Sequence, residues 1–364
     1  MSYAPIPMVP GPVSLHPDVI AALAQDYGSG QVESDFMNLY DATSRDIARL
    51  MGTNNDVVLM TGEGMLALWG ALKSCLRPGD PVVSVGTGVF GDGIGEMAES
   101  FGCRVEKVSL PYNSTIDDLS RVEEAIRRVR PVMLTAVHCE TPSGTLNPLA
   151  ALGKLKQDMH VPLFYMDCVA SLGGAPVEAD AWHVDLALGG SQKCLSCPPS
   201  MSMAGISEVA WERMKEVNYQ GYDAILPFKT VRTDGRCPYT PSWHGIAALH
   251  AGARALFKEG LNNVFKRHEA VAAQCRAGLA ELGIPLWTAP DAVNAPTVTA
   301  AMIPSGYTWP QWKEALRRHG LVCTGSFGPM ANKVFRLGHM GTQAQPYLME
   351  QALDAISRTL HAAA

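Results

Sequence analysis

The sequence predicts an α/β protein: a large domain with a mainly parallel sheet covered by helices, followed by a smaller C-terminal α+β domain. Three observations predict this class. Short apolar runs alternate with amphipathic helical stretches over residues 57–188, Gly, Pro and Asp residues separate them, and residues 298–364 read strand–helix–strand–helix. The length of 364 residues suits a large domain with a second, smaller one.

The individual elements follow from local patterns. Apolar runs of strand length occupy 57–60, 81–85, 105–110, 132–137, 163–166, 186–188, 298–303 and 333–337. Apolar residues at helical spacing predict helices at 36–51, 65–76, 119–130, 150–157, 309–318 and 345–362, with a long, broken helix over 243–282. The segment 206–240 shows no clear pattern. We expect an irregular N-terminal arm at 1–20, a large domain at 21–255 and a small domain at 256–364.

Composition excludes several classes of partner. The chain has 29 Lys and Arg against 35 Asp and Glu, a net charge of −6, with no long run of one sign, which argues against nucleic-acid binding. No apolar stretch approaches the length of a membrane span, and no secretory signal is visible. The nine scattered cysteines suit a reducing cytoplasm, and the Cys194–Cys197 pair lacks a second pair at zinc-site distance, so no metal is expected. We expect a cytoplasmic enzyme that acts on small molecules.

One glycine pattern suggests an alternative. Gly86, Gly88 and Gly91 follow the apolar run 81–85 with the spacing of a dinucleotide fingerprint, and Glu106 lies at the distance of its ribose-binding acid. This pattern would predict a nicotinamide-dependent dehydrogenase. However, the fingerprint normally opens a domain, whereas a complete strand–helix unit, 57–76, precedes it here.

A lysine and an aspartate predict a different chemistry. Lys193 lies on a glycine-lined turn just after the strand 186–188, where a lysine able to become neutral can form an imine and move protons. Asp167 ends the strand 163–166, at the edge of the sheet where ligands bind. Taken singly, the lysine reads as a surface residue and the aspartate as a helix cap. Together they suit a pyridine ring, whose nitrogen needs a carboxylate partner.

At this point the chain resembles a known family. Residues 138–144, 167–174 and 190–193, with 10–12 and 336–341 at the two ends, look like the class V aminotransferases, close to the alanine–glyoxylate and serine–glyoxylate enzymes. The resemblance extends over nearly the whole chain. It implies the fold-type I architecture, vitamin B6 chemistry, and a homodimer or homotetramer whose sites borrow residues across the subunit interface.

The resemblance also assigns roles. Lys193 would be the Schiff-base lysine and Asp167 the partner of the pyridine nitrogen. Phe90 would stack on one face of the ring and Val169 on the other, while Arg336 would bind the substrate carboxylate with its two-pronged guanidinium. The remaining residues expected around the ring and the phosphate site are Glu63, Gly64, Met65, Thr141, Ser143, Gln192, Cys194 and Thr240.

The phosphate site departs from the family pattern. Relatives place the 5′-phosphate on a glycine-rich turn at a helix N-terminus, but here the turn 61–65 contains Glu63 instead of a small residue. Two like charges about 4 Å apart repel by roughly 4 kcal/mol at a surface-like dielectric. Thr240 is retained, while a tyrosine position near it is Cys237. A negative Glu63 would therefore reject a phosphorylated ligand, although an acid there could also be a simple helix N-terminal charge.

One family member, pyridoxamine–pyruvate transaminase, uses an unphosphorylated ring, and the chain resembles it at 62–63, 110–113, 141–144, 193–195 and 338–341. The implied reaction converts pyridoxamine and a small 2-oxo acid into pyridoxal and an amino acid, a step of vitamin B6 degradation. The alternative is a pyridoxal 5′-phosphate enzyme of the alanine/serine–glyoxylate kind. Phe327 replaces a second arginine and Phe90 a stacking tyrosine of that transaminase, so the oxo acid stays open.

Overall fold

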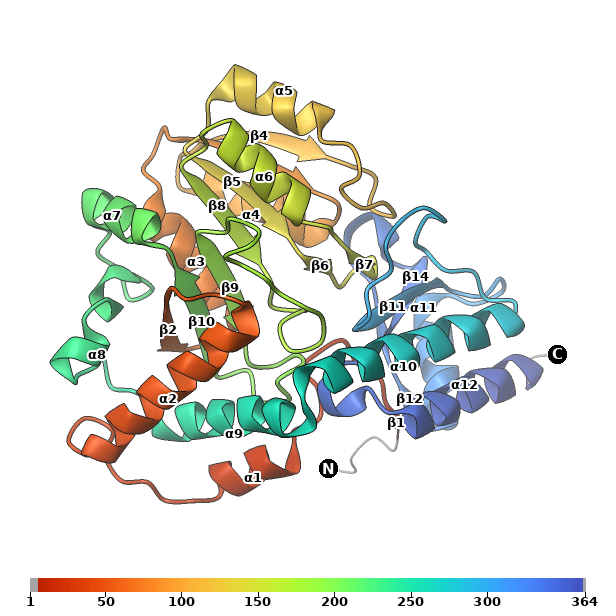
Figure 1. The fold of residues 1–364 in the computed structure, drawn as a ribbon. Helices are drawn as coiled ribbons and strands as arrows, with labels where there is room; N and C mark the ends of the chain where they lie inside the picture. Colours follow the sequence, from red (N-terminus) through yellow and green to blue (C-terminus); the bar gives the residue numbers. More distant parts are fainter. Residues whose placement is uncertain (1–5, 363–364) are drawn as a thin grey trace.

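A computed structural model describes residues 6–362, which fold around a seven-stranded sheet (Figure 1). Its strands lie in the order β2-β10-β9-β8-β5-β3-β4. Their bounds are β2 Asp56–Thr61, β3 Pro81–Gly86, β4 Arg104–Ser109, β5 Met133–Val137, β8 Leu163–Asp167, β9 Leu186–Gly190 and β10 Met201–Ile206. Strand β10 runs antiparallel to β2 and β9, while the other pairs are parallel. The sheet is thus mainly parallel, as predicted.

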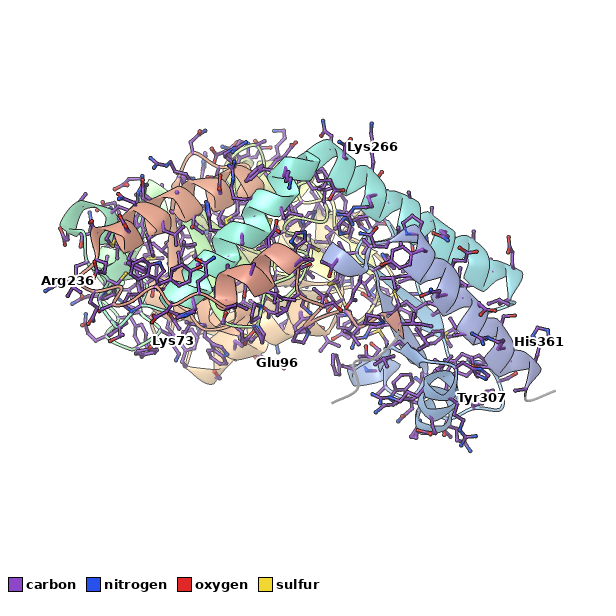
Figure 2. The ribbon with its side chains drawn as sticks, turned by 90° about the horizontal axis from the view of Figure 1, so that it is seen from below. Lys73, Glu96, Arg236, Lys266, Tyr307 and His361 are labelled. Carbon is purple, nitrogen blue, oxygen red and sulfur yellow. The ribbon has the colours of Figure 1, made fainter. Side chains whose placement is uncertain are left out.

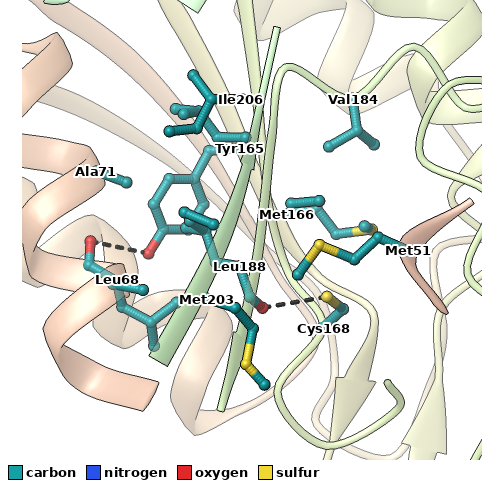
Figure 3. Close-up of a cluster of buried hydrophobic side chains, with 14 of the residues drawn as sticks. Met51, Leu68, Ala71, Tyr165, Met166, Cys168, Val184, Leu188, Met203 and Ile206 are labelled. Carbon is teal, nitrogen blue, oxygen red and sulfur yellow. Dashed lines mark hydrogen bonds between the residues drawn. The ribbon is translucent and has the colours of Figure 1, made fainter. Parts of the chain in front are cut away.

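Helices cover both faces of this sheet (Figure 1). The helices that contact it are α2 Ser34–Met51, α3 Gly64–Cys75, α4 Val89–Ser100, α5 Ser120–Val129, α6 Ala150–Asp158 and α9 Trp243–Glu259. Helix α1 Pro17–Leu23 packs on α9 and α7 Glu208–Val217 packs on α3, and a short 3₁₀ turn at Leu226–Phe228 and α8 Val231–Asp234 follow α7 in the chain. Apolar side chains fill both faces of β8: Figure 3 shows that Tyr165 donates to the Leu68 carbonyl of α3 (3.2 Å), while its neighbour Met166 packs with Met51 of α2. Burial on both faces fixes the end of β8, where Asp167 lies.

The C-terminal part has its own core. A three-stranded antiparallel sheet within the described range combines β11 Val298–Met302, β14 Val334–Gly338 and β13 Thr324–Gly325. Helices α10 Leu261–Glu281, α11 Trp309–Arg318 and α12 Pro346–His361 pack on it around Trp312 and Phe335, and 3₁₀ turns span Gly328–Met330 and Gly341–Gln343. In the view from below, Arg236 and His361 mark opposite ends of the molecule (Figure 2). The predicted long helix is broken, as expected, at Gly260 between α9 and α10.

The N-terminal arm is more ordered than expected. Its strand β1 (Ile6–Pro7) pairs in parallel with β12 (Leu321–Val322) of the C-terminal part, and α1 begins at Pro17 with the His16 side chain accepting the Asp18 N–H (3.1 Å). Further along, the Val13 N–H donates to the Gln192 carbonyl (3.2 Å). The arm therefore links the two parts of the molecule; residues 1–5 of the predicted arm lie outside the described residues.

Among the elements that the sequence did not predict, three have a clear physical reason. Strand β10 is buried at every position and rich in small residues and methionine, so it shows no alternation. Helix α4 contains Gly91, Gly93 and Gly95, which weaken a helix signal. Helix α7 follows β10 directly, with Ser207 as its N-cap, inside the segment that had no clear pattern.

Candidate active site

The candidate site lies where the parallel strands end. A cavity of about 500 Å³ lies at this edge of the sheet. Its walls are formed mainly by residues at or just after the C-terminal ends of β2, β3, β5, β8 and β9. Nine of the predicted site residues line it: Glu63, Gly64, Met65, Phe90, Thr141, Asp167, Val169, Gln192 and Lys193. Leu68, Cys139 and Ala170 also line the cavity but were not predicted as site residues. Cys139 and Ala170 lie inside the family motifs 138–144 and 167–174, which could have indicated that they are near the site but not that they face the cavity.

Asp167 is held rigidly at the end of β8. It pairs with Val137 on one side and Leu188 on the other, and its carboxylate accepts the Val169 N–H at 2.8 Å. Burial raises the pKa of Asp167 to about 6, against the Val169 hydrogen bond and the Lys193 charge, which lower it. A buried carboxylate in this position has the chemistry needed by a protonated pyridine nitrogen.

Lys193 follows β9 and is partly buried beneath the N-terminal arm. Its amine donates to the Pro10 carbonyl, and a Cβ on Gly11 would lie 2.5 Å from Lys193 Cδ, so the arm backbone touches the lysine where only glycine fits. Burial, followed by the Arg336 charge, lowers the pKa of Lys193. The lowered pKa makes the neutral amine available for attack on a carbonyl carbon.

Arg336 lies in a second cavity that adjoins the first. This cavity, of about 940 Å³, is shared by Phe90, Thr141 and Lys193 and is also lined by Phe327. Arg336 is only 4% exposed; its Nε donates to the Gly325 carbonyl (2.9 Å) and its Nη1 to the Thr141 carbonyl (3.4 Å). The Phe327 ring centre lies 4.7 Å from the guanidinium carbon. The guanidinium is therefore held in a cavity that Lys193 also lines, with the two-pronged geometry that suits a carboxylate.

The opposite end of the cavity is formed by the start of α3. Glu63 precedes the helix, and among residues 6–362 its side chain makes no capping bond to it. Instead the Glu63 carboxylate accepts from Gln192 Nε2 at 2.9 Å. The other amide atom, Gln192 Oε1, is buried without a hydrogen-bond partner in the described chain.

Three predicted residues lie away from the cavity wall. Ser143 is buried and its hydroxyl bonds to Thr145 (2.8 Å), and the Cys194 thiol points to the Ala170 carbonyl (3.7 Å). Thr240 lines a separate cavity and accepts from Gln31 Nε2 at 3.4 Å. The described chain therefore does not bring these three side chains to the ring cavity.

The glycine pattern at the start of α4 has a structural explanation. The Glu140 carboxylate accepts the Gly91 N–H (2.6 Å) and the Phe90 N–H (3.3 Å). A Cβ on Gly88 would lie 2.5 Å from Glu140 Cδ, and one on Gly86 would lie 2.1 Å from Asp92 Oδ1. Burial raises the pKa of Glu140 to about 8. Protein carboxylates thus occupy the turn that a dinucleotide phosphate would need, which argues against the dehydrogenase alternative.

The described residues contain neither a candidate metal centre nor a candidate membrane span. Over 6–362, no group of three or more His, Cys, Asp or Glu side chains is placed to hold a metal ion. No helix in the same range has the length and apolarity needed to cross a membrane.

The parallel-sheet edge, the partly buried lysine and the buried aspartate are the arrangement expected of the fold-type I class of vitamin B6 enzymes. The chain belongs to the class V aminotransferase family, whose model matches residues 16–335. It is 31% identical to the pyridoxamine–pyruvate transaminase of Mesorhizobium japonicum, over 98% of this chain and 92% of the relative. It is 31% identical to the alanine–glyoxylate aminotransferase of Oryctolagus cuniculus, over 96% and 91%.

Solved structures agree. The crystal structure of pyridoxamine–pyruvate aminotransferase from Mesorhizobium loti superposes with a TM-score of 0.94 at 30% identity, covering 100% of this chain and 93% of that one. The chain is therefore an aminotransferase that acts on small molecules, and the predicted fold class is confirmed.

Proposed function

We propose that the protein transfers an amino group between free pyridoxamine or pyridoxal and a small 2-oxo acid: pyridoxamine and the oxo acid give pyridoxal and the corresponding L-amino acid. The observation that carries the proposal is the Glu63–Gln192 pair at the start of α3. Two relatives with pyridoxamine and pyruvate in their names support it.

The Glu63–Gln192 pair suits the 5′-hydroxyl group of a free vitamer better than a 5′-phosphate. The Glu63 carboxylate and the buried Gln192 Oε1 are both acceptors, and a phosphate dianion offers only further acceptors and negative charge. A 5′-hydroxymethyl group can donate a hydrogen bond to either. Leaving a buried acceptor unpaired costs about 1–3 kcal/mol, so a donor at this place would stabilise the complex.

The other residues are proposed to act as follows. When bound, the pyridine ring accepts electron density from the carbon that loses a proton. Asp167 keeps the ring nitrogen protonated. Lys193 moves a proton between C4′ of the vitamer and the α-carbon of the amino acid. Arg336 binds the α-carboxylate, and Phe90 and Val169 hold the two faces of the ring.

The second candidate is a pyridoxal 5′-phosphate-dependent aminotransferase of the alanine/serine–glyoxylate kind. The identity to the rabbit alanine–glyoxylate enzyme favours it, since it equals the identity to the pyridoxamine relative. The ring end of the cavity would serve both enzymes equally well. Only the α3 end distinguishes them.

The visible spectrum of the purified protein before and after exhaustive dialysis separates the candidates. We expect the yellow imine colour to appear when pyridoxal is added and to wash out on dialysis. Colour that persists through dialysis, with phosphate released on denaturation, would overturn the proposal in favour of the phosphate-dependent enzyme.

We also propose a cytoplasmic homodimer or homotetramer in which Thr240 reaches the site of the neighbouring subunit, with a step of vitamin B6 degradation as the biological role. The position of Thr240 outside the cavity of its own chain supports this arrangement. Sedimentation of the purified protein tests it: a monomer that is fully active would contradict it.

A further inference from the structure

The described residues contain one buried carboxylate beside the site that the proposed chemistry does not use, Glu140. It lies on β6 (Cys139–Glu140), which forms a small hairpin with β7 (Thr145–Leu146). Its neighbours in sequence, Cys139 and Thr141, line the ring cavity, whereas its own side chain points to the first turn of α4.

The contact between Glu140 and α4 is tightly built. The carboxylate receives the N–H groups of Phe90 and Gly91, two successive residues of the first helical turn. A Cβ on Gly88 would lie 2.5 Å from Glu140 Cδ, so this glycine leaves room for the carboxyl group, while a Cβ on Gly91 would first meet Gly86 Cα at 2.7 Å. A side-chain oxygen that accepts free N–H groups at a helix N-terminus is favoured by hydrogen bonding, even though burial raises the pKa of Glu140 to about 8.

The same hairpin also contacts the substrate-carboxylate side. The carbonyl of Thr141 accepts from Arg336 Nη1 (3.4 Å), and the carbonyl of Pro142 accepts from Ser326 Oγ (2.7 Å), next to Phe327. The three consecutive residues 140–142 therefore form hydrogen bonds both to the backbone of Phe90 and to the side chains of Arg336 and Ser326.

From this geometry we propose that Glu140 is a positioning residue: by holding the first turn of α4 it sets the Phe90 ring against the pyridine and in register with the carboxylate bound by Arg336. The inference rests on the proposed function for the role of Phe90. It assigns to Gly88 a purpose in the chemistry of this site, since this glycine admits the carboxyl group that fixes the aromatic side chain, whereas Gly86 makes room for Asp92.

A double-mutant cycle tests this role. We expect Glu140→Ala to weaken pyridoxal binding, followed by the visible absorption of the complex, about tenfold when Phe90 is present. In a Phe90→Ala background the same change should alter the affinity less than twofold. Glu140→Gln, which keeps one acceptor and the side-chain volume, should recover part of the loss. Glu99→Ala, at the exposed far end of α4, serves as the control and should leave affinity unchanged.

Equal losses in both backgrounds would overturn the inference, because Glu140 would then support the fold and not Phe90. If Glu140→Ala fails to fold, the same cycle with Glu140→Gln decides. Running the cycle with both pyridoxal and pyridoxal 5′-phosphate keeps the two proposals distinguishable. If the unmodified protein binds pyridoxal 5′-phosphate more tightly than pyridoxal, the proposed substrate is wrong. The coupling between residues 140 and 90 can still be measured with pyridoxal 5′-phosphate in that case.

Discussion

Two glycine-containing turns of this molecule connect a parallel strand to a helix, and both have a protein carboxylate where an anion could bind. Between β3 and α4, Glu140 accepts two backbone N–H groups of the helix and is completely buried. Between β2 and α3, Glu63 makes no bond to its helix in the described chain and pairs with the Gln192 side chain at the cavity wall. The first turn is closed by the protein, whereas the second is open to a ligand.

This difference shows why a glycine pattern alone is a weak predictor of ligands. The turn that best matches a phosphate-binding fingerprint is satisfied internally, and the turn that faces the cavity has a charge that opposes phosphate. Under the proposed function, the choice between a free and a phosphorylated ring depends on Glu63 at the open turn, and the following changes test that comparison.

The largest effect on activity should come from a change of Lys193. The turn between β2 and α3 can select a ligand only if the imine forms on a lysine of the same cavity. Lys193→Ala should lower turnover about a thousandfold or more, because the same amine forms the imine and moves the proton. Borohydride reduction of the pyridoxal complex followed by peptide mapping should place the adduct on residue 193. Lys154→Ala, on the exposed side of α6, is the control. An adduct on any other lysine would refute the site.

Next, Glu63→Ser should convert the open turn into a phosphate site. Removing the carboxylate removes the like-charge repulsion, so affinity for pyridoxal 5′-phosphate should rise at least about tenfold, measured by absorbance titration. Glu33→Ser is a matched control, because Glu33 also precedes a helix without capping it through its side chain in the described structure. Unchanged phosphate affinity in the Glu63 variant would remove this residue from the proposal.

The pH profile should report Asp167. With a pKa of about 6, its carboxylate becomes protonated as the pH falls through that value, and the ring nitrogen loses its partner. We expect kcat/KM to fall about tenfold per pH unit below pH 6. Since the Glu63 charge is one cause of the raised pKa, Glu63→Ser should move this acid limb to lower pH. A flat profile down to pH 5 would contradict the assignment.

The smallest effect is expected at Phe327. Its ring is 51% exposed and lies over Arg336, where a cation–π contact contributes about 0.5–1 kcal/mol. Phe327→Ala should therefore raise KM for the 2-oxo acid about two- to fivefold with little change in kcat. Tyr347→Ala, another exposed aromatic, on α12, should have no effect. An unchanged KM in the Phe327 variant would show that the ring does not support the guanidinium.

Much of this arrangement could be predicted from the sequence. The alternation of apolar runs and helical stretches gave the strands that end at Asp167 and before Lys193, because buried parallel strands have a clear apolar signature. Strand β10 was not predicted, since small buried residues show no periodicity, and α4 was not predicted because its three glycines weaken the helix signal. The partners of Lys193 and Glu63 could not be predicted, because Pro10 and Gln192 are distant in sequence and only folding brings them close.

The path of residues 6–13 connects mechanics to chemistry. One short stretch adds a strand beside β12, accepts the Gly338 N–H through the Met8 carbonyl (2.9 Å), and then receives the Lys193 amine on the Pro10 carbonyl. The backbone segment 6–13 therefore joins the C-terminal part directly to the Lys193 amine, so a displacement of that part relative to the large sheet would also displace the Pro10 carbonyl.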